Sequence, residues 1–436
     1  MNLSRIGKLL ALVLALLMVV GVALPVFADE DVEAEEIVPE GRIEVVYWNL
    51  LGGGDGAILK DIVAEYNAIQ DVIYVRNMTQ DWGQYYTKLR TAALGGTSPD
   101  MAISHADNIM GLYEAGILMP LDVEMDRLGV AFDFDQVGSP SFEVCKYEGH
   151  YYGVPQDILT NLYVYNKELL EPLGLLDADG KPNYLDNLDD FLAACDQMLD
   201  ATPDLFPHVS YQDGHMVCAP WFGFYNQTGA KPDFLSEDRT KTEFDEAKAL
   251  ESLELMQKFY SVVPADMTNA FDLFTEGKVY GIVEGTWSVS TFLTRMQPEQ
   301  LGIVPFPQFV DKTLPSCAVY SHCLTLPVST TRDDETTKAA LEFIKYFVEN
   351  NEKWAEAGHL PSYKPAYETE FFKALPLREG YADAMDSIIP FPSSPKLEIY
   401  TAPEINSPLE LLVKGEITPA ECLAEMIEGL DHALED

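Results

Sequence analysis

Residues 43–66 read IEVVYWNLLGGGDGAILKDIVAEY and hold a strand pattern, a glycine-rich connection and a helix pattern in direct succession. The run from 43 to 48 is apolar and rich in β-branched residues, which is typical of a buried strand. After the glycines, apolar residues recur at helical spacing on one face: Ile58, Leu59, Ile62, Val63 and Tyr66. A strand followed closely by an amphipathic helix is the repeating unit of an α/β fold.

The same alternation runs along the rest of the chain. Further strand patterns occupy 72–75, 101–104, 163–165 and 279–283, and helix patterns occupy 84–94, 110–115, 188–199, 247–260, 337–350 and 419–434. Alternating strands and helices favour βαβ units. We therefore expect an α/β protein with largely parallel sheets.

The glycines at 52–54 and 56 raise the question of a phosphate-binding loop. Gly52, Gly54 and Ala57 fit the spacing GxGxxA, but three residues separate Trp48 from the first glycine, and the next strand ends in Val75-Arg76-Asn77 instead of an acid. The dinucleotide fingerprint needs glycines directly after the strand and that acid, and a Walker loop needs Gly-Lys-Ser/Thr. We expect a flexible strand-to-helix loop at the rim of a cleft.

The N-terminus has the three parts of a secretory signal. Arg5 and Lys8 precede an uncharged run from 9 to 27, and Val26-Phe27-Ala28 ends it before Asp29-Glu30. This pattern predicts a signal peptide over 1–28, followed by an acidic spacer over 29–41. We expect a secreted protein, periplasmic or associated with the cell surface. No cysteine lies near the cleavage site, so no lipobox is indicated.

Charge and length limit the function further. The 436-residue chain has a net charge of −43, and removal of the signal peptide leaves 408 residues with a charge of −45. Such a surface repels nucleic acid and anionic lipid, so we expect neither as a partner. A mature chain of this length exceeds a single core, which predicts two domains.

The six cysteines show no metal-binding spacing. Cys317 and Cys323 are near enough in the sequence to form a disulfide, and buried free thiols are the alternative.

Several phrases resemble the extracellular solute-binding proteins of ABC importers, specifically the class that contains maltose-binding and other sugar-binding proteins. The phrases are RIEVVYW at 42–48, GGTSPDMAISHADNIMGLYEAGILMPLD at 95–122, GHYYGVPQDILTNLYVYNKELLEPLGL at 149–175, FTEGKVYGIVEGTWSVSTF at 274–292, GIVPFPQ at 302–308 and TKAALEFIKYFVENNEKWAEAGHLPSYKPAY at 337–367. In this order they span nearly the whole mature chain.

The resemblance implies two α/β lobes joined by a hinge that the chain crosses more than once, with the ligand cleft between them. We expect an N-terminal lobe over 42–157 with about 318–365, and a C-terminal lobe over 158–317 with about 366–436. It also implies a carbohydrate ligand, a mono- or oligosaccharide, and an ABC permease as partner. We expect a monomer that needs no cofactor.

Aromatic side chains are the first candidates for a sugar site, because flat rings cover the C–H faces of a pyranose. Trp287 follows a strand and matches the position of a sugar-stacking tryptophan in the maltose-binding relatives. Trp221 lies in APWFGFYNQTGAKPDF, which we expect to be a loop lining the cleft. Trp48 ends the first strand, and Trp82 lies at a helix start where Asp81 is a candidate N-cap.

Polar candidates lie beside the same strand ends, where open α/β sheets bind ligands. Asp107 is either a ligand contact or a helix cap, and Asp157 either accepts a sugar hydroxyl or braces the hinge. The remaining predicted ligand residues are Asn49, Asp55, His105, His359 and Tyr363.

No motif indicates catalysis or a metal. The seven histidines form no HxxxH or HExxH pair, no GxSxG elbow is present, and the DADGK stretch at 177–181 is better explained as a surface turn than as a calcium loop. Two alternatives to a sugar receptor stay open at this point. One is a secreted carbohydrate-active enzyme, since paired carboxylates are not recognisable from sequence. The other is a receptor for a non-sugar solute.

Overall fold

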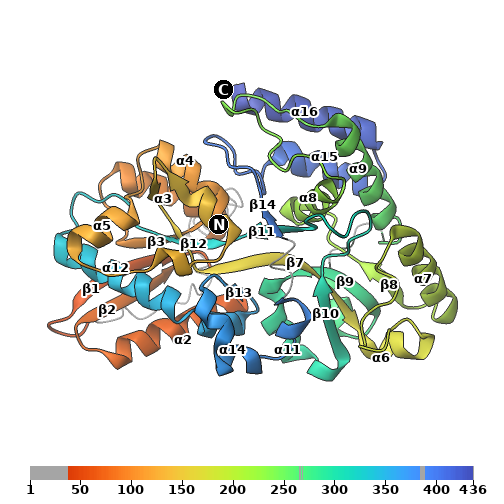
Figure 1. The fold of residues 1–436 in the computed structure, drawn as a ribbon, viewed down its shortest axis with the longest axis horizontal. Coiled ribbons are helices and arrows are strands. Elements are labelled where there is room, and N and C mark those ends of the chain that lie inside the picture. The colour runs from red at the N-terminus through yellow and green to blue at the C-terminus, as the bar shows by residue number, and fades with distance from the viewer. Residues whose placement is uncertain (1–37, 265–266, 268, 383–387, 436) are drawn as a thin grey trace, which may run out of the picture. The chain divides into compact units, whose positions relative to one another are not determined.

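The computed structural model describes residues 38–264, 267, 269–382 and 388–435. The predicted signal peptide and the spacer up to residue 37 lie outside the described residues. From Gly41 onward the chain forms one unit, which holds two main β-sheets (Figure 1).

The first sheet contains five strands in the order β2-β1-β3-β12-β6. Their bounds are β1 Ile43–Asn49, β2 Ile73–Thr79, β3 Met101–His105, β6 Val154–Pro155 and β12 His322–Thr325. β1 pairs in parallel with β2 and β3, whereas β12 is antiparallel to both β3 and β6. β12, which lies between β3 and β6 in this sheet, therefore comes from a part of the chain far from the other four strands.

The second sheet is built around one long strand, β7. Its strands are β7 Asp157–Asn166, β8 Phe206–Val209, β9 Val279–Gly285, β10 Leu301–Pro305, β11 Cys317–Tyr320, β13 Leu360–Pro361 and β14 Ile388–Pro390. Strands β9, β10, β11 and β13 are all antiparallel to β7. The expectation of largely parallel sheets is wrong here, because strands that return from distant loops pair with β7 in the opposite direction. A separate pair, β4 Lys146–Tyr147 and β5 His150–Tyr151, completes the strands.

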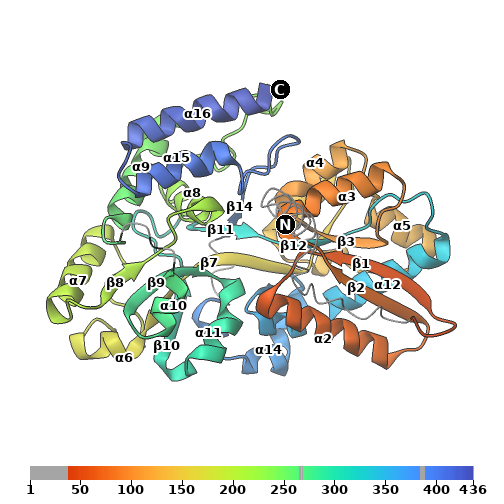
Figure 2. The same ribbon diagram turned by 180° about the vertical axis from the view of Figure 1, so that it is seen from behind.

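Helices cover both sheets, as the alternation predicts. The α-helices of the first part of the chain are α2 Gly53–Ile69, α3 Tyr85–Leu94, α4 Ile109–Glu114, α5 Leu121–Leu128, α6 Lys167–Leu170, α7 Leu188–Ala201 and α8 Cys218–Gln227. Those of the second part are α9 Glu246–Tyr260, α10 Ala270–Thr275, α11 Val289–Arg295, α12 Asp334–Glu349, α13 Asn351–Trp354, α14 Glu370–Ala374, α15 Pro403–Val413 and α16 Pro419–Glu435. α9, α15 and α16 lie side by side in both ribbon views (Figures 1 and 2).

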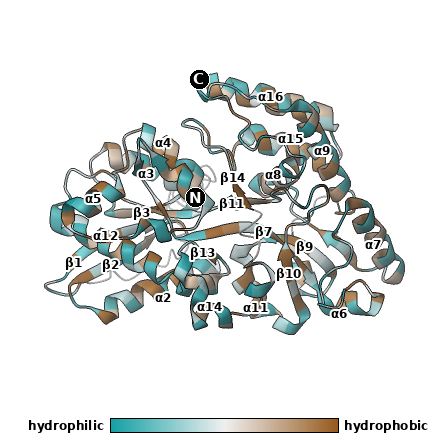
Figure 3. Ribbon diagram, in the orientation of Figure 1, coloured by the Kyte–Doolittle hydropathy of each residue, from teal (hydrophilic) through white to brown (hydrophobic). Residues whose placement is uncertain are grey.

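Each sheet has its own hydrophobic core. One core gathers residues from Val45 to Val154 and from Cys323 to Ala357, and the other gathers residues from Ile158 to Tyr320 together with a later set ending at Leu434. Hydrophobic colour is concentrated on β7, whereas α12 mixes hydrophobic and hydrophilic residues, as its amphipathic sequence requires (Figure 3). The exact bounds of the predicted lobes stay a prediction.

Within the described residues, the chain crosses between the two sheets at three places. It leaves the first sheet between β6 and β7 at Gln156 and returns between β11 and β12 at Ser321. It leaves again between Ala357, which packs in the first core, and Leu360 on β13. A hinge crossed more than once is therefore confirmed, and these crossings set the position of the site described below.

The glycine-rich stretch is not the open loop that its sequence suggests. Helix α2 begins at Gly53, whose φ of +55° is the conformation that glycine adopts without strain. A Cβ on Gly54 would lie 2.6 Å from Oγ of Ser290 on α11. The glycines thus let the first turn of α2 approach the second lobe closely.

Candidate functional site

Asp157, the first residue of β7, ties the crossing segments together. Its Oδ1 accepts a hydrogen bond from the backbone N–H of His322 at 2.8 Å. Its Oδ2 accepts from His322 Nδ1 at 2.7 Å and from Trp354 Nε1 at 2.8 Å. Burial raises the pKa of this carboxyl, but the interactions with His322 and the hydrogen bonds outweigh burial, so the pKa lies below its usual value. Of the two roles considered for Asp157, these contacts match the bracing of the hinge.

His359, in the third crossing, connects both lobes. Its Nε2 lies 3.1 Å from Oδ2 of Asp55 on α2, and its Nδ1 lies 3.2 Å from Oγ1 of Thr286, which follows β9. The ring also stacks on Trp354 at 5.3 Å. Burial lowers the pKa of His359, but the charges of Asp55 and Asp157 outweigh burial and raise the pKa above the ordinary value.

A cavity of about 240 Å³ opens beside these crossings. Its wall combines residues of both lobes: Leu50, Leu51, Gly52, Asp55, Trp82, His105, Leu159, His215, Met216, Trp287, Tyr320, His322 and Tyr400. Among the described residues that line it, none is lysine or arginine. The cavity is thus bounded by aromatic and aliphatic side chains with few polar groups, which is the usual composition of a small-molecule site.

Aromatic rings form the larger part of that wall. Trp82 is 47% exposed and stacks on His215 at 5.5 Å and 27°, which brings a first-lobe ring against a second-lobe ring. Trp287 packs edge-on to Tyr320 at 6.4 Å. A Cβ on Gly285 would lie 2.2 Å from the indole of Trp287, so the absent side chain at Gly285 leaves room for this ring.

Three polar side chains face the cavity with hydrogen-bonding capacity to spare. Oδ1 of Asp55 is buried and has no hydrogen-bond partner among the described residues. His105 and His322 use Nδ1 for bonds to Tyr86 and Asp157, which leaves Nε2 of each ring without a partner in the same part of the chain. Burial lowers the pKa of His105 to about 3, so this ring is neutral at physiological pH.

Of the eleven residues predicted to bind ligand, the structure brings four to the cavity: Asp55, Trp82, His105 and Trp287. Asp81 also caps the short helix η1 Trp82–Gln84, accepting from the backbone N–H of Gln84 as predicted. His105 ends β3, and the other three lie in the first turn of a helix that follows a strand, which is the part of the fold that the sequence argument used.

Trp221 is a correction to the sequence analysis. The segment expected to be a cleft-lining loop is helix α8, and Trp221 is fully buried in the core of the second sheet, where it stacks on Tyr225 at 5.6 Å. The many aromatic residues of this segment pack inward together with Phe234 and Phe244. The many aromatic residues of this segment therefore belong to the hydrophobic core and form no binding surface.

Trp48 and Asn49 also lie away from the cavity wall. Trp48 packs against the first core, and its carbonyl accepts a hydrogen bond from Tyr85 Oη. Asn49 is fully buried, where its Oδ1 accepts from the backbone N–H of Leu51 and its Nδ2 donates to Oδ1 of Asn77 at 2.6 Å. Asn49 thus shapes the turn that leads into α2, whereas Trp48 belongs to the core packing.

Asp107 and Tyr363 are the last two of the predicted ligand residues. Oδ2 of Asp107 is buried without a hydrogen-bond partner among the described residues, and the N-cap positions of the two helices that follow β3, η2 Ala106–Asn108 and α4, are His105 and Asn108. Burial, followed by the nearby Glu398, raises the pKa of Asp107 to about 8. Tyr363 packs against the first core, and its backbone N–H donates to Asn351. Neither residue lines the 240 Å³ cavity.

The sequence analysis missed nine of the cavity residues: Leu50, Leu51 and Gly52 after β1, Leu159 on β7, and five others that fall into two groups. Tyr320 and His322 flank Ser321 at the second crossing, so polar residues where the chain changes sheets were a usable signal. His215, Met216 and Tyr400 come from η6 Gly214–Val217 and from the segment before α15, and no local pattern marks them. Only the packing of the second lobe brings them to the cavity.

Metal-binding groups come together at the hinge. Ligand atoms of Asp157, His322 and His359 lie within 4.8 Å of one another and are buried, so these three residues are the set in the described chain that could hold an ion. In this structure two N–H groups point their hydrogens at Oδ2 of Asp157. The arrangement seen is therefore a hydrogen-bonded network.

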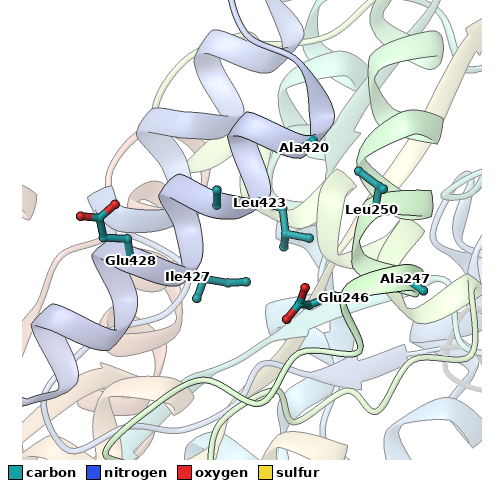
Figure 4. A pocket seen from close by; sticks show the side chains of 8 residues that line it. Glu246, Ala247, Leu250, Ala420, Leu423, Ile427 and Glu428 are labelled. Carbon is teal, nitrogen blue, oxygen red and sulfur yellow. The ribbon is translucent and has the colours of Figure 1, made fainter.

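A larger pocket of about 600 Å³ lies elsewhere, between α9 and α16 (Figure 4). Leu250, Leu423 and Ile427 form its apolar surface, with the carboxylates of Glu246 and Glu428 beside them. It has neither an aromatic ring nor a neutral hydrogen-bonding side chain among its lining residues. Its chemistry therefore suits a polar ligand less well than the smaller cavity does.

The cysteines are all free and buried: Cys145, Cys195, Cys218, Cys317, Cys323 and Cys422. Of the two possibilities for Cys317 and Cys323, the structure has free thiols; Cys323 lies instead with its Sγ 3.6 Å from Cys145 Sγ. Among the described residues, no helix has the length and apolar character needed to cross a membrane.

Comparisons with known proteins show which family the chain belongs to. The sequence profile of the family described as bacterial extracellular solute-binding protein matches residues 61–380. A galactooligosaccharide-binding protein of Bacillus subtilis is 24% identical, and the match covers 88% of each chain. Two solved structures have the same fold at low sequence identity.

The first of these structures is the GacH receptor of Streptomyces glaucescens, solved unliganded and with acarbose. It has a TM-score of 0.74 and 18% identity, with 90% of this chain and 98% of that chain covered. The second is UgpB of Mycobacterium tuberculosis in complex with glycerophosphocholine, with a TM-score of 0.73, 16% identity, and 91% and 99% covered. The two-lobe α/β fold is thus confirmed. From the profile match over residues 61–380, this chain belongs to the bacterial extracellular solute-binding proteins.

Proposed function

We propose that this protein is the extracytoplasmic substrate-binding receptor of an ABC importer, which captures a neutral mono- or oligosaccharide by closure of its lobes and delivers it to a membrane permease. The observation that carries the proposal is the 240 Å³ cavity, whose wall takes Asp55, Trp82 and His105 from one lobe and His215 and Trp287 from the other. A ligand that contacts both lobes stabilises the closed form over the open one.

The chemistry of the wall favours a sugar over other solutes. Indole and phenol rings supply flat faces for C–H groups, and the imidazoles and the unpartnered carboxylate oxygen of Asp55 supply hydrogen bonds for hydroxyls. A phosphate-bearing ligand, such as the one bound in the UgpB structure, calls for a cation. The described wall has no lysine or arginine, and burial keeps His105 neutral.

The cavity also bears on the enzyme alternative. Hydrolysis of a glycosidic bond requires two carboxyl groups that flank it. Asp55 is the one carboxylate among the described residues of the wall. A receptor that releases its ligand unchanged needs no second carboxylate. We therefore infer a binding protein that is not an enzyme and uses no cofactor. We also infer that the receptor is secreted, monomeric and docks on a permease. Its membership in the bacterial extracellular solute-binding proteins and its likeness to a galactooligosaccharide-binding protein support the secretion and the permease partner.

A ligand screen tests the proposal. Maltotriose, galactobiose, arabinotriose, acarbose and glycerophosphocholine are each added to the purified mature chain, and the midpoint of thermal unfolding is recorded. Binding to the folded state adds about 2.7 kcal/mol at 100 times Kd, so we expect one or more saccharides to raise the midpoint by several degrees. Stabilisation by glycerophosphocholine alone would overturn the sugar assignment. Chromatography of the incubated sugars, if it showed cleavage products, would overturn the receptor.

A further inference from the structure

His105 and His322 are direct neighbours across the first sheet. They form the opposed pair His322↔His105 in the antiparallel ladder of β3 and β12, and their ring centroids are 5.2 Å apart. Both rings line the 240 Å³ cavity. The strand pairing therefore presents two imidazoles side by side to whatever fills it.

Tyr86 determines which nitrogen of His105 carries the proton. Its Oη lies 2.8 Å from the backbone N of His105 and 2.8 Å from Nδ1 of the same residue. The backbone N–H donates to Oη, so the hydroxyl hydrogen of Tyr86 is directed to Nδ1, which lies at hydrogen-bond distance. Oε1 of Glu398 is farther from the same Nδ1, at 3.8 Å, so Tyr86 is the hydrogen-bond partner of this nitrogen. Nδ1 of the neutral ring then accepts, and the proton of His105 is on Nε2.

Asp157 determines the opposite arrangement in His322. Its carboxylate oxygen lies 2.7 Å from Nδ1 of His322, and a carboxylate only accepts hydrogen bonds. Nδ1 of His322 is therefore the protonated nitrogen. The backbone N–H of His322 donates to the other oxygen of the same carboxylate and keeps it in place beside the ring. In the neutral ring this leaves a lone pair on Nε2.

We propose that His105 and His322 form a donor–acceptor pair that binds a single sugar hydroxyl, with Nε2–H of His105 donating to its oxygen and Nε2 of His322 accepting its hydrogen. This proposal rests on the proposed function and specifies its ligand chemistry. A hydroxyl is able to donate and accept at once. An ether oxygen only accepts and an ammonium group only donates, so the pair selects a free hydroxyl over an O-methyl or amino group at that position.

The selectivity has a measurable size. A substituent that leaves one partner of a buried pair unsatisfied weakens binding by about 10- to 100-fold. The same loss is expected for His105→Leu and for His322→Leu. His105→Gln retains an amide donor at similar reach and should recover part of the affinity. Tyr86 is a positioning residue, and Tyr86→Phe should weaken binding less while changing the tautomer of His105.

Nitrogen NMR of the ligand-free mature chain tests the tautomers directly. Long-range 1H–15N spectra of the histidine-labelled protein distinguish Nδ1–H, Nε2–H and the charged ring, and the single variants assign the signals. We expect Nε2–H for His105 and Nδ1–H for His322, with His105 becoming a mixture in Tyr86→Phe. His150 is the control, because its Nδ1 also lies 2.8 Å from a carboxylate, Asp122, but on an exposed surface. His150→Gln should leave sugar affinity unchanged.

Calorimetry then tests the ligand assignment. Whichever of maltotriose, galactobiose and arabinotriose binds is compared with its mono-O-methyl and mono-amino derivatives, and one position should reject both. Identical tautomers, a charged His322, or tolerance of O-methylation at every position would overturn this inference while leaving sugar binding intact. If no sugar binds, the proposed function fails and the hydroxyl assignment fails with it, whatever the NMR spectra show.

Discussion

His359 and Asp55 lie 304 positions apart in the chain, yet Nε2 of His359 is 3.1 Å from Oδ2 of Asp55. The contact joins the first turn of α2 to the third crossing between the sheets. Since His359 also reaches Thr286 of the other lobe, the pair couples the position of Asp55 at the cavity to the arrangement of the hinge.

The Asp55–His359 pair predicts a pH-dependent stability. A histidine whose pKa is raised by folding contributes stability that is complete below its unfolded pKa of about 6.5 and is lost as the pH rises through the folded value. Asp55→Asn should therefore lower the free energy of unfolding by about 1–3 kcal/mol at pH 6, and less at higher pH. Chemical denaturation across pH 5.5–9 measures this difference. The exposed pair of His150 and Asp122 provides the control variant Asp122→Asn, and an equal pH dependence there would contradict the prediction.

Asp157→Asn should be among the most destabilising single substitutions in the chain. Removing the charge leaves His322, Trp354 and a backbone N–H around a weaker acceptor, and disrupting a buried charged group costs about 3–5 kcal/mol. The folded pKa of Asp157 is lowered, so its contribution is present above the unfolded pKa and decreases as the pH falls through the folded value. Urea unfolding at pH 7 and pH 3.5 should show the deficit at neutral pH and a smaller one in acid. A loss below 1 kcal/mol at neutral pH would be inconsistent with the bracing role.

Gly285→Ala should displace the indole of Trp287 and weaken sugar binding by about 3- to 10-fold, because the new methyl would lie 2.2 Å from the ring. Gly302→Ala is the matched control: its Cβ would meet the ring of Tyr165 at 2.0 Å, away from the cavity. Both variants should lose stability, but only Gly285→Ala should change the calorimetric Kd. Equal affinities in the two would show that Trp287 does not contact the ligand.

Asp107→Asn should raise stability at pH 7 to 8. The pKa of this carboxyl is raised by burial and by Glu398 to about 8, so the folded state binds the proton more tightly than the unfolded state. Stability of the unmodified chain then falls between about pH 4 and pH 8, by up to about 1.4 kcal/mol per pH unit. In Asp107→Asn the free energy of unfolding, measured by urea titration at each pH, should change less with pH. Glu398→Gln should have a similar effect, and additive gains in the double variant would argue against a shared cause.

The six thiols should be unreactive in the folded protein and all available after unfolding, because each cysteine is buried and free. Titration with a thiol reagent in buffer and in guanidinium chloride measures both states without reductant. Fewer than six thiols after unfolding would reveal a disulfide and contradict the structure.

The alternation of apolar patterns identified many of the α/β elements, since a helix or strand has the apolar period of the face that it buries, but it missed others such as α8 and β12. It did not determine strand direction: β7 collects antiparallel partners from distant segments, and pairing over such separations leaves no local pattern. Trp221 shows that the prediction of site residues has the same weakness. Its aromatic neighbours look the same in sequence whether they face a cleft or a core, and only packing decides which.

What the sequence determined by itself was the family, much of the secondary structure and the chemistry available after strand ends, including Asp55, Trp82, His105 and Trp287. Tertiary structure decided which of these side chains share a cavity, and it added His215, Tyr320, His322 and Tyr400. It also decided the tautomers of His105 and His322, because Tyr86 and Asp157 reach those rings only after the sheet has formed. Periodicity depends on neighbours along the chain, whereas a binding site depends on distances across it.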